Sequence, residues 1–197
     1  MPAVPPDLSE GLIARVLEHL VVHGPADLSL GALAQALGTS TFSLSSQFGT
    51  KNDMLSAVLE RLELRQRTRL ATVLGGGPDL GASASIRAVW QSLVDHLDEE
   101  QLILELSVRR RSDLAPELRA RLTLAWVEAV ETILVRAGVP VDLAQAEATL
   151  LCAVLAGLEI DLLTTGDRAR LDVAVARYAD QAATRWTTMA ASASHGP

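Results

Sequence analysis

Apolar residues recur along this chain at the three- and four-residue spacing of amphipathic helices, and breaks rich in Gly, Pro and Asp separate the helical stretches. No stretch alternates convincingly with the two-residue period of a strand. The pattern therefore predicts an all-α fold of about nine helices. The helices are expected near residues 8–23, 29–37, 40–48, 51–73, 85–97, 99–110, 116–137, 143–165 and 168–189.

Residues 28–59 hold the most informative part of this pattern. Two helical stretches lie here, and both are too short to bury a core alone; they end at Gly38 and Gly49. Two short helices joined by a Gly-containing turn indicate a helix-turn-helix, whose second helix can enter the major groove of DNA. Ser29 and either Thr39 or Ser40 are expected to cap these helices.

The helix that follows, at 51–73, has its own start signal. Thr50 and Asp53 stand at the spacing of a capping box, with Asp in place of the preferred Glu. The second half of this helix is dominated by charge, so we expect it to be shared between two bodies.

A linker divides the chain after this shared helix. Gly and Pro cluster in residues 74–85, LGGGPDLGASAS, and break both helical and strand periodicity. We therefore expect an N-terminal head at 1–50, a larger helical body at 74–190 and a disordered tail at 191–197.

The charge balance bears on the partners of the chain. Its 197 residues are 49% apolar and carry a net charge of −7. Residues 1–50 contain one basic residue, Arg15, against four acidic ones, a balance of −3. Because neutralised phosphates supply much of the affinity for nucleic acid, a DNA-binding head of this composition is expected to bind weakly.

The location of the chain is indicated by its cysteine count and its apolar segments. A single cysteine, Cys152, excludes an intrachain disulfide and fits a reducing, cytoplasmic setting. The N-terminus has no signal-peptide pattern. The longest apolar stretch, near 148–158, is shorter than the roughly 20 residues that a spanning helix needs, so no membrane is expected.

The residues of the short helices also carry a family resemblance. Over about residues 10–60 the chain resembles the TetR family of transcriptional regulators, in ungapped spacing, at Leu33-Ala34, Leu37-Gly38, Ser40, Leu44, Phe48-Gly49, Lys51 and Leu55. The segment 162–172, LLTTGDRARLD, is similar to the junction between the last two helices of many members.

This resemblance implies a homodimeric, ligand-responsive transcriptional regulator, in most cases a repressor. The helix at 40–48 would read a palindromic double-stranded DNA operator, and the helices at 85–137 would hold a small, mainly apolar ligand. The last two helices would pair with a second copy. Ligand binding would shift the helix at 51–73 and release the DNA.

The candidate DNA-contacting residues are polar and, except for one lysine, uncharged: Ser29, Ser40, Thr41, Phe42, Ser43, Ser45, Ser46, Gln47 and Lys51. Hydroxyl groups bond phosphates or base edges, and Gln can pair with adenine. Lys51 opens a helix, where the dipole favours acids, and this misfit favours a phosphate contact. Phe42 either contacts a thymine methyl or packs back onto the preceding helix.

Ser45 departs from the family, which usually has an aromatic at this position to contact the DNA backbone. Together with the acidic head, this departure leaves an alternative open. The chain would then be a TetR-like dimer that binds a ligand or a partner and whose DNA binding is weakened or lost.

The candidate ligand-binding residues of the body are Trp90, His96, Glu105, Arg109 and Trp126. The two tryptophans are either pocket walls or ordinary core, and the polar residues are either pocket groups or solvated helix ends. For the dimer interface we expect the apolar residues Leu151, Val154, Leu155, Leu158 and Leu162, because the helix at 143–165 is more apolar than one partner helix can cover.

Nothing in the sequence predicts an enzyme, a metal site or a cofactor. His19 and His23 have a four-residue spacing, but the Glu of an HExxH motif is missing between them. No nucleophile elbow, cofactor fingerprint or paired-carboxylate signature is present, so no catalytic residue is assigned.

Overall fold

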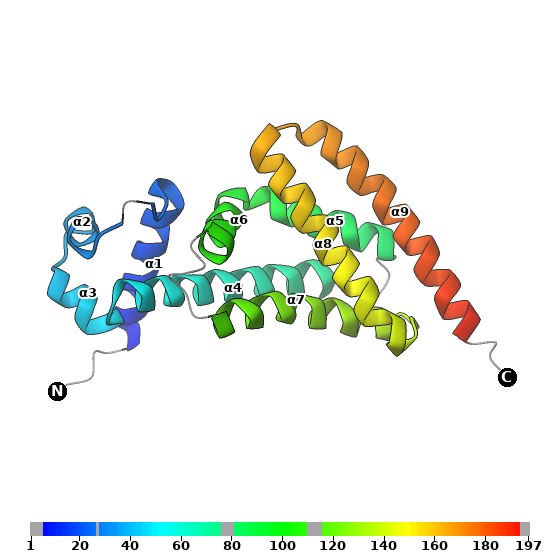
Figure 1. Ribbon diagram of the computed structural model, residues 1–197, viewed down its shortest axis with the longest axis horizontal. Helices are drawn as coiled ribbons and strands as arrows, with labels where there is room; N and C mark the ends of the chain where they lie inside the picture. Colours follow the sequence, from blue (N-terminus) through cyan, green and yellow to red (C-terminus); the bar gives the residue numbers. More distant parts are fainter. Residues whose placement is uncertain (1–5, 27, 76–80, 110–115, 194–197) are drawn as a thin grey trace. The chain divides into compact units, whose positions relative to one another are not determined.

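The computed structural model describes residues 6–26, 28–75, 81–109 and 116–193, and these residues contain helices and connecting turns but no strand (Figure 1). The predicted all-α class is confirmed for this part of the chain. The helices are α1 (Pro6–His23), α2 (Leu30–Ala36), α3 (Thr41–Phe48), α4 (Lys51–Gly75), α5 (Ala82–Asp95), α6 (Leu97–Leu104), α7 (Pro116–Arg136), α8 (Val141–Thr165) and α9 (Arg168–Ala193).

The chain divides into two compact units. The first unit comprises residues 1–66 and 98–120, and the second comprises 67–97 and 121–197. The boundary near residue 66 falls inside α4, so this helix contributes to both units.

The first unit has a core built from one face of each helix. In α1, Val16, Leu17 and Leu20 are buried at helical spacing, and in α2 and α3 the buried residues are Leu33, Ala34 and Leu44. The first half of α4 supplies Met54, Leu55, Val58, Leu59 and Leu62. These short helices are stable because they share this core, since isolated helices of seven or eight residues do not persist in water.

The predicted starts of the short helices are confirmed. Ser29 caps α2, with its hydroxyl accepting from the amide of Ala32, and Ser40 caps α3 by accepting from the amide of Ser43. Thr50 and Asp53 form a reciprocal capping box. The Thr50 amide donates to Asp53 Oδ2 at 2.9 Å, and the Asp53 amide donates to Thr50 Oγ1 at 3.2 Å.

Glycine is required at the end of α3. Gly49 has φ of 81°, a backbone conformation that residues with a side chain rarely adopt. A Cβ atom at this position would also lie 2.8 Å from Asp53 Oδ2, which belongs to the capping box of α4. Gly49 therefore allows α3 and α4 to follow each other without a longer loop.

The second unit is centred on α5, α8 and α9, and Figure 1 shows α8 and α9 joined as a hairpin. Helix α5 packs closely along α9. Trp90 of α5 is buried there, and its indole Nε1 donates to Asp172 Oδ1 of α9 at 2.7 Å. This bond satisfies the polar atom of a buried tryptophan.

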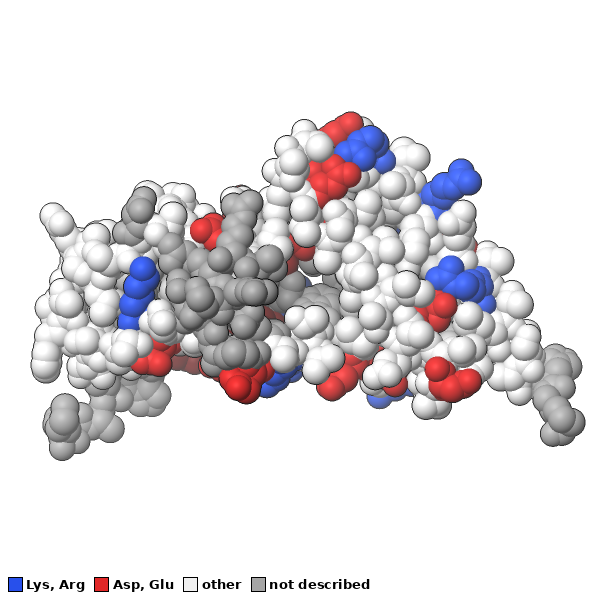
Figure 2. All heavy atoms as spheres, in the orientation of Figure 1, with Lys and Arg blue, Asp and Glu red and all other residues white. Residues whose placement is uncertain are grey.

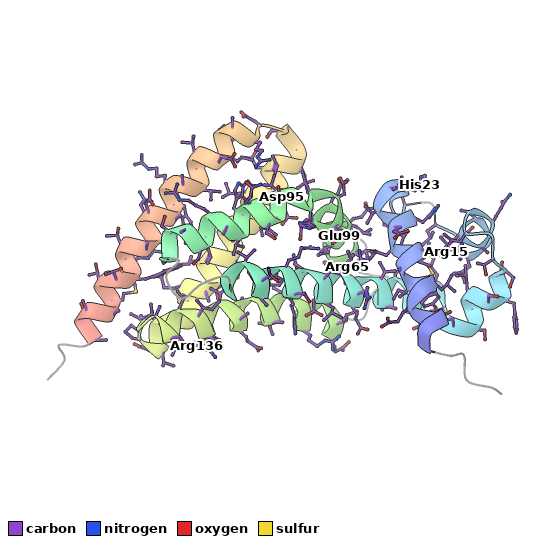
Figure 3. All side chains as sticks on the ribbon, turned by 180° about the vertical axis from the view of Figure 1, so that it is seen from behind. Arg15, His23, Arg65, Asp95, Glu99 and Arg136 are labelled. Carbon is purple, nitrogen blue, oxygen red and sulfur yellow. The ribbon has the colours of Figure 1, made fainter. Side chains whose placement is uncertain are left out.

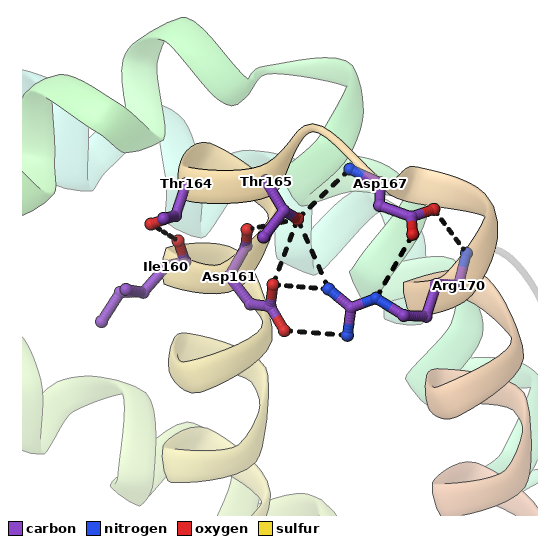
Figure 4. Close-up of polar contacts among 6 residues, drawn as sticks. All are labelled: Ile160, Asp161, Thr164, Thr165, Asp167 and Arg170. Atoms are coloured by element: carbon purple, nitrogen blue, oxygen red, sulfur yellow. Dashed lines mark hydrogen bonds and ion pairs between the residues drawn. The ribbon is translucent and has the colours of Figure 1, made fainter.

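The turn between α8 and α9 is held by an ion-pair cluster (Figure 4). The Arg170 guanidinium donates to both carboxylate oxygens of Asp161, at 3.1 and 2.6 Å, and lies 3.4 Å from Asp167. Asp167 also accepts from the Arg170 amide at 3.2 Å, which caps the start of α9. The cluster joins the last turn of α8 to the first turn of α9.

The helix boundaries that differ most from the predicted ones are those of α5, α6 and α9. Helix α5 begins at Ala82 rather than near Ser85, because Ala and Ser continue the helix back to Gly81. Of the predicted linker, residues 76–80 lie outside the described part. Helix α6 ends at Leu104 in a π-helical turn, Glu105–Arg109. Helix α9 continues to Ala193, so the first residues of the predicted tail are helical, and 194–197 lie outside the described residues.

Helix α8 begins at Val141 rather than at the predicted Leu143, and it is as apolar as the sequence predicts. By length and composition alone its 25 residues could cross a membrane, and only 22% of its most apolar stretch is buried inside the chain. The inner side of this helix lies in the core of the second unit. Its outer side is an apolar surface that the chain itself leaves uncovered.

Candidate functional site

The outer surface of α3 presents most of the candidate DNA-contacting residues. Thr41, Phe42, Ser43, Ser45 and Ser46 are all exposed, whereas Leu44 is buried beneath them. Gln47 and Lys51 are half-buried. The fold thus brings the candidates from residue 40 to 51 together on α3 and the start of α4.

Some of the α3 hydroxyls are already engaged. Ser40 Oγ lies 2.8 Å from Ser43 Oγ and also accepts from the Ser43 amide at 3.0 Å. Ser45 Oγ donates to the Phe42 carbonyl at 3.2 Å. A hydroxyl can both donate and accept, so these bonds fix the rotamers while leaving acceptor lone pairs for a further partner.

Phe42 is the most conspicuous side chain of α3. It is 75% exposed. Of the two placements that the sequence left open, Phe42 therefore has the exposed one and does not pack back onto α2. Phe42 lies three residues before Ser45, and residues at this spacing share one helix face. An aromatic is therefore present on the same helix face as Ser45.

The charge of the head is as sparse in the structure as in the sequence. The guanidinium of Arg15 donates to the carbonyl of Leu37, at the C-terminal end of α2, which occupies the one basic side chain before Lys51. On the face shown in Figure 2, few blue atoms lie over the N-terminal helices. Lys51 is left as the basic group nearest the α3 surface in sequence.

The candidate ligand-binding residues fall in different units. Trp90, His96 and Trp126 belong to the second unit, and Glu105 and Arg109 to the first. Trp90 is core against α9 rather than an open wall. His96 is exposed at the end of α5, with Nδ1 2.9 Å from the Ser92 carbonyl.

The remaining candidates are Trp126, Glu105 and Arg109. Trp126 of α7 is half-buried, beside Val127 and Val130, which pack against the core of the second unit. Glu105 is half-buried in the π-helical turn. The side chain of Arg109 lies outside the described residues.

The second unit contains a buried polar cluster that the sequence did not predict. The Glu147 carboxylate on α8 accepts from Arg185 Nη2 and from Trp186 Nε1, both at 2.7 Å. Burial by itself raises the pKa of Glu147, but these hydrogen bonds and the charge of Arg185 outweigh it and lower the pKa. The signal was a Glu at an apolar position of helix α8, since a buried Glu needs a partner.

Two other ionisable groups of α8 are perturbed by burial. Burial raises the pKa of Glu159 to about 7, with no hydrogen bond or neighbouring charge contributing to the shift. Burial likewise raises the pKa of the Cys152 thiol to about 11. The thiolate is the reactive form of cysteine, so Cys152 is a weak nucleophile at neutral pH.

The predicted dimer residues of α8 lie mostly inside the chain. Leu151, Leu155 and Leu162 are buried in the core of the second unit, and Leu158 is partly buried against the same core. These leucines serve α8's packing on its own chain. Val154 is half-buried. Periodicity could not separate the two sides, because α8 is apolar almost all round.

The outer face of α8 is a distinct set of exposed residues. Leu150 and Ile160 are 53% and 47% exposed. We define the outer seam as the exposed residues Leu143, Ala146, Leu150, Ala153, Gly157, Ile160 and Thr164. Their alternating three- and four-residue spacing is that of a helix–helix packing seam, with small residues between larger apolar ones.

The structure of the chain is similar to several solved structures. A TetR transcriptional regulator from Legionella pneumophila superposes with a TM-score of 0.72 and 15% identity, over 92% of this chain and 98% of that chain. The chain has the TetR fold. The sequence by itself matches no protein-family model and no curated protein.

Two further structures with the TetR fold were solved with bound partners. BioQ in complex with its natural double-stranded DNA operator has a TM-score of 0.56 and 23% identity, over 89% of this chain and 98% of that chain. A TetR variant from Acinetobacter baumannii in complex with minocycline has a TM-score of 0.61 and 16% identity, over 95% of this chain and 99% of that chain. At these identities, the shared property is the fold.

Proposed function

We propose that the chain is a transcriptional regulator of the TetR type, which binds operator DNA as a homodimer and is released by a small, mainly apolar ligand. The proposal assigns DNA binding to the head, residues 1–50, and ligand binding and dimerisation to the body, residues 74–190. The exposed polar surface of α3, mounted on an intact helix-turn-helix core, is the observation that carries it.

The proposed DNA contacts follow from this surface. Gln47 and the hydroxyls of Thr41 and Ser46 reach base edges or phosphates, Lys51 neutralises a phosphate, and Phe42 contacts a thymine methyl. Phe42 also takes over part of the backbone contact that the family's aromatic makes, because it shares a helix face with Ser45. The complex of BioQ with its operator supports this assignment for the fold.

The experiment is a fluorescence-anisotropy titration on intergenic DNA next to the chain's own gene, located first by footprinting. Lys51→Ala is expected to weaken binding of all sequences, and Gln47→Ala to weaken the operator more than unrelated DNA by roughly tenfold, the effect of about 1–2 kcal/mol of base recognition. Gln145→Ala, an exposed glutamine on α8, is the matched control and leaves binding unchanged.

The small number of basic residues in the head also predicts how DNA binding depends on salt concentration. With about two or three cations per protomer, log K falls with log salt with a slope far shallower than −8 for the dimer. A slope of −8 or steeper contradicts the assigned contacts. The acidic head favours a second candidate, a TetR-like dimer that does not bind DNA. If the chain binds no DNA at low salt, either with or without ligand, this second candidate is the correct one.

For the ligand, we propose the neighbourhood of Trp126 as the responsive part of the body. A half-buried tryptophan on α7 is placed to sense an apolar molecule, whereas Trp186 on α9 is buried and bonded to Glu147. Quenching of tryptophan fluorescence by a panel of apolar aromatic compounds is expected to disappear in Trp126→Phe and persist in Trp186→Phe. If quenching persists in Trp126→Phe, the ligand does not bind near Trp126.

A further inference from the structure

Two histidines of α1 lie one helical turn apart and face the same way. The ring centroids of His19 and His23 are 4.5 Å apart, with the ring planes inclined at 44°. His19 is half-buried and His23 is exposed, so the pair stands at the border of core and solvent. Figure 3 labels His23 at the end of α1.

Both side chains of this pair are of the type that ligates transition metals. A neutral imidazole is the form that ligates a metal, and it is also the form in which two histidines can approach each other without repulsion.

Arg15, the basic residue on this face of α1, is engaged elsewhere. Arg15 lies one turn before His19 on the same face of α1, but its guanidinium is directed to the Leu37 carbonyl of α2. Among the described residues, no group of three or more His, Cys, Asp or Glu side chains is placed to hold a metal. Any ion at this pair has two protein ligands, and water completes its shell.

We propose that His19 and His23 form a two-histidine site for a divalent transition-metal ion such as Zn²⁺, Ni²⁺ or Cu²⁺. Zn²⁺ lies about 2.0–2.1 Å from each imidazole nitrogen that ligates it, so two ligating rings have to lie close together, as these two rings do. Imidazole ligands select these ions over Mg²⁺ and Ca²⁺, which prefer oxygen. The four-residue spacing is the one by which HExxH helices hold zinc.

The same spacing excludes a hydrolytic role. Between the histidines stand Leu20, Val21 and Val22, so the Glu that acts as general base in HExxH enzymes is missing. The ion instead bridges two turns of α1 and adds two positive charges to the acidic head. The site is therefore structural and electrostatic, and we infer it without relying on the proposed DNA binding.

The test is the thermal unfolding of the untagged full chain at pH 7.5, with ZnCl₂ and with EDTA. At a Zn²⁺ concentration about tenfold above Kd, Tm is expected to rise by roughly 3–6 °C, as linkage predicts for a chain of this size. His23→Ala, which changes an exposed residue, abolishes the rise. His96→Ala changes another exposed histidine and is the matched control that keeps it.

A second measurement counts the metal ligands directly and does not depend on the stability of the variant. The electron paramagnetic resonance spectrum of one equivalent of bound Cu²⁺ is expected to show two equatorial imidazole nitrogens, and only one in His23→Ala. A Zn²⁺-dependent rise in Tm that is the same in His23→Ala as in the unaltered chain, or a Cu²⁺ spectrum with a single imidazole, overturns the site.

Discussion

Single residues of α8 show how the same side-chain type takes opposite properties in one helix. Glu147 is buried and Glu159 is half-buried. Glu147 meets Arg185 and Trp186, and its pKa is lowered despite burial, whereas burial acts alone on Glu159 and raises its pKa to about 7. The first glutamate is a charged structural link between α8 and α9, and the second is a carboxyl that is half-protonated near neutral pH.

Glu159 makes stability depend on pH in a defined direction. Because its folded pKa of about 7 lies above the ordinary 4.5, its favourable contribution is complete below pH 4.5 and is lost as pH rises through 7. Glu159→Gln, which stays neutral, is therefore expected to gain stability relative to the unaltered chain between pH 5 and pH 8, by roughly 2–3 kcal/mol at most. Denaturant unfolding at both pH values measures this gain.

The control for this prediction is Glu128→Gln, an exposed glutamate on α7. Its stability difference from the unaltered chain should be flat over the same range of pH. A flat difference for Glu159→Gln as well would mean that water reaches this carboxyl.

The contribution of Glu147 to stability changes with pH in the opposite direction. Its pKa is lowered from 4.5, so the stability that its partners confer is present above pH 4.5 and is lost as pH falls through the lowered value. Arg185→Ala leaves the buried carboxylate with one donor and is expected to cost roughly 3 kcal/mol near neutral pH, the low end for a broken buried pair because Arg185 is partly exposed.

The acid dependence supplies the check on this assignment. Unfolding monitored from pH 7 to pH 3 should show a smaller loss of stability in Arg185→Ala than in the unaltered chain. Arg170→Ala, at the exposed corner between α8 and α9, breaks an ion pair that solvent screens, so it should cost much less. Equal costs for the two arginines would contradict the burial of the Glu147 link.

Among the elements, the short helices of the head were the most predictable and α8 was the least. Gly38 and Gly49, the serine caps and the buried leucines all act locally or at helical spacing, so the sequence specifies them. Which side of α8 faces its own core is decided by contacts with α5 and α9. These contacts are tertiary, and a helix that is apolar nearly all round gives no periodic signal for them.

In the candidate site as well, local features could be predicted from the sequence and tertiary contacts could not. The polar surface of α3 followed from periodicity, since burying Leu44 turns its neighbours outward. The role of Trp90 did not follow, because its partner Asp172 lies 82 residues further along the chain. Glu147 was missed for the same reason, since both of its partners are on α9.

The cap of α3 yields a prediction for this element alone. Ser40→Ala removes the acceptor for the Ser43 amide and is expected to destabilise the head by about 1 kcal/mol. Hydrogen exchange of the α3 amides measures the effect without DNA. Ser46→Ala, an exposed serine on the same helix outside the cap, should leave exchange nearly unchanged, and a comparable effect there would argue against capping.

For the whole molecule, the uncovered outer seam of α8 is the feature with the largest consequence. Apolar surface of this extent on one helix needs a partner, and a second copy of the chain offers the same seam to pack against. Small residues, Ala153 and Gly157, lie between Leu150 and Ile160 and permit a close approach of two helices. We expect the chain to dimerise through this seam rather than through the inner leucines.

The dimer prediction is tested by light scattering coupled to size exclusion. The unaltered chain is expected at twice its monomer mass of 20.9 kDa at micromolar concentration. Leu150→Arg places a charge in the seam and should give a monomer. Leu64→Arg on α4 is the matched control, because Leu64 and Leu150 are both 53% exposed. A monomer for the unaltered chain, or for Leu64→Arg alone, contradicts the assignment.

The half-buried Lys51 at the start of α4 has one more consequence, because it is the only lysine among 197 residues. Amine-directed acylation has one side-chain target in this chain, and that target is the proposed phosphate contact. Acylation of this one amine removes its positive charge, so a single covalent event is expected to weaken DNA binding as Lys51→Ala does.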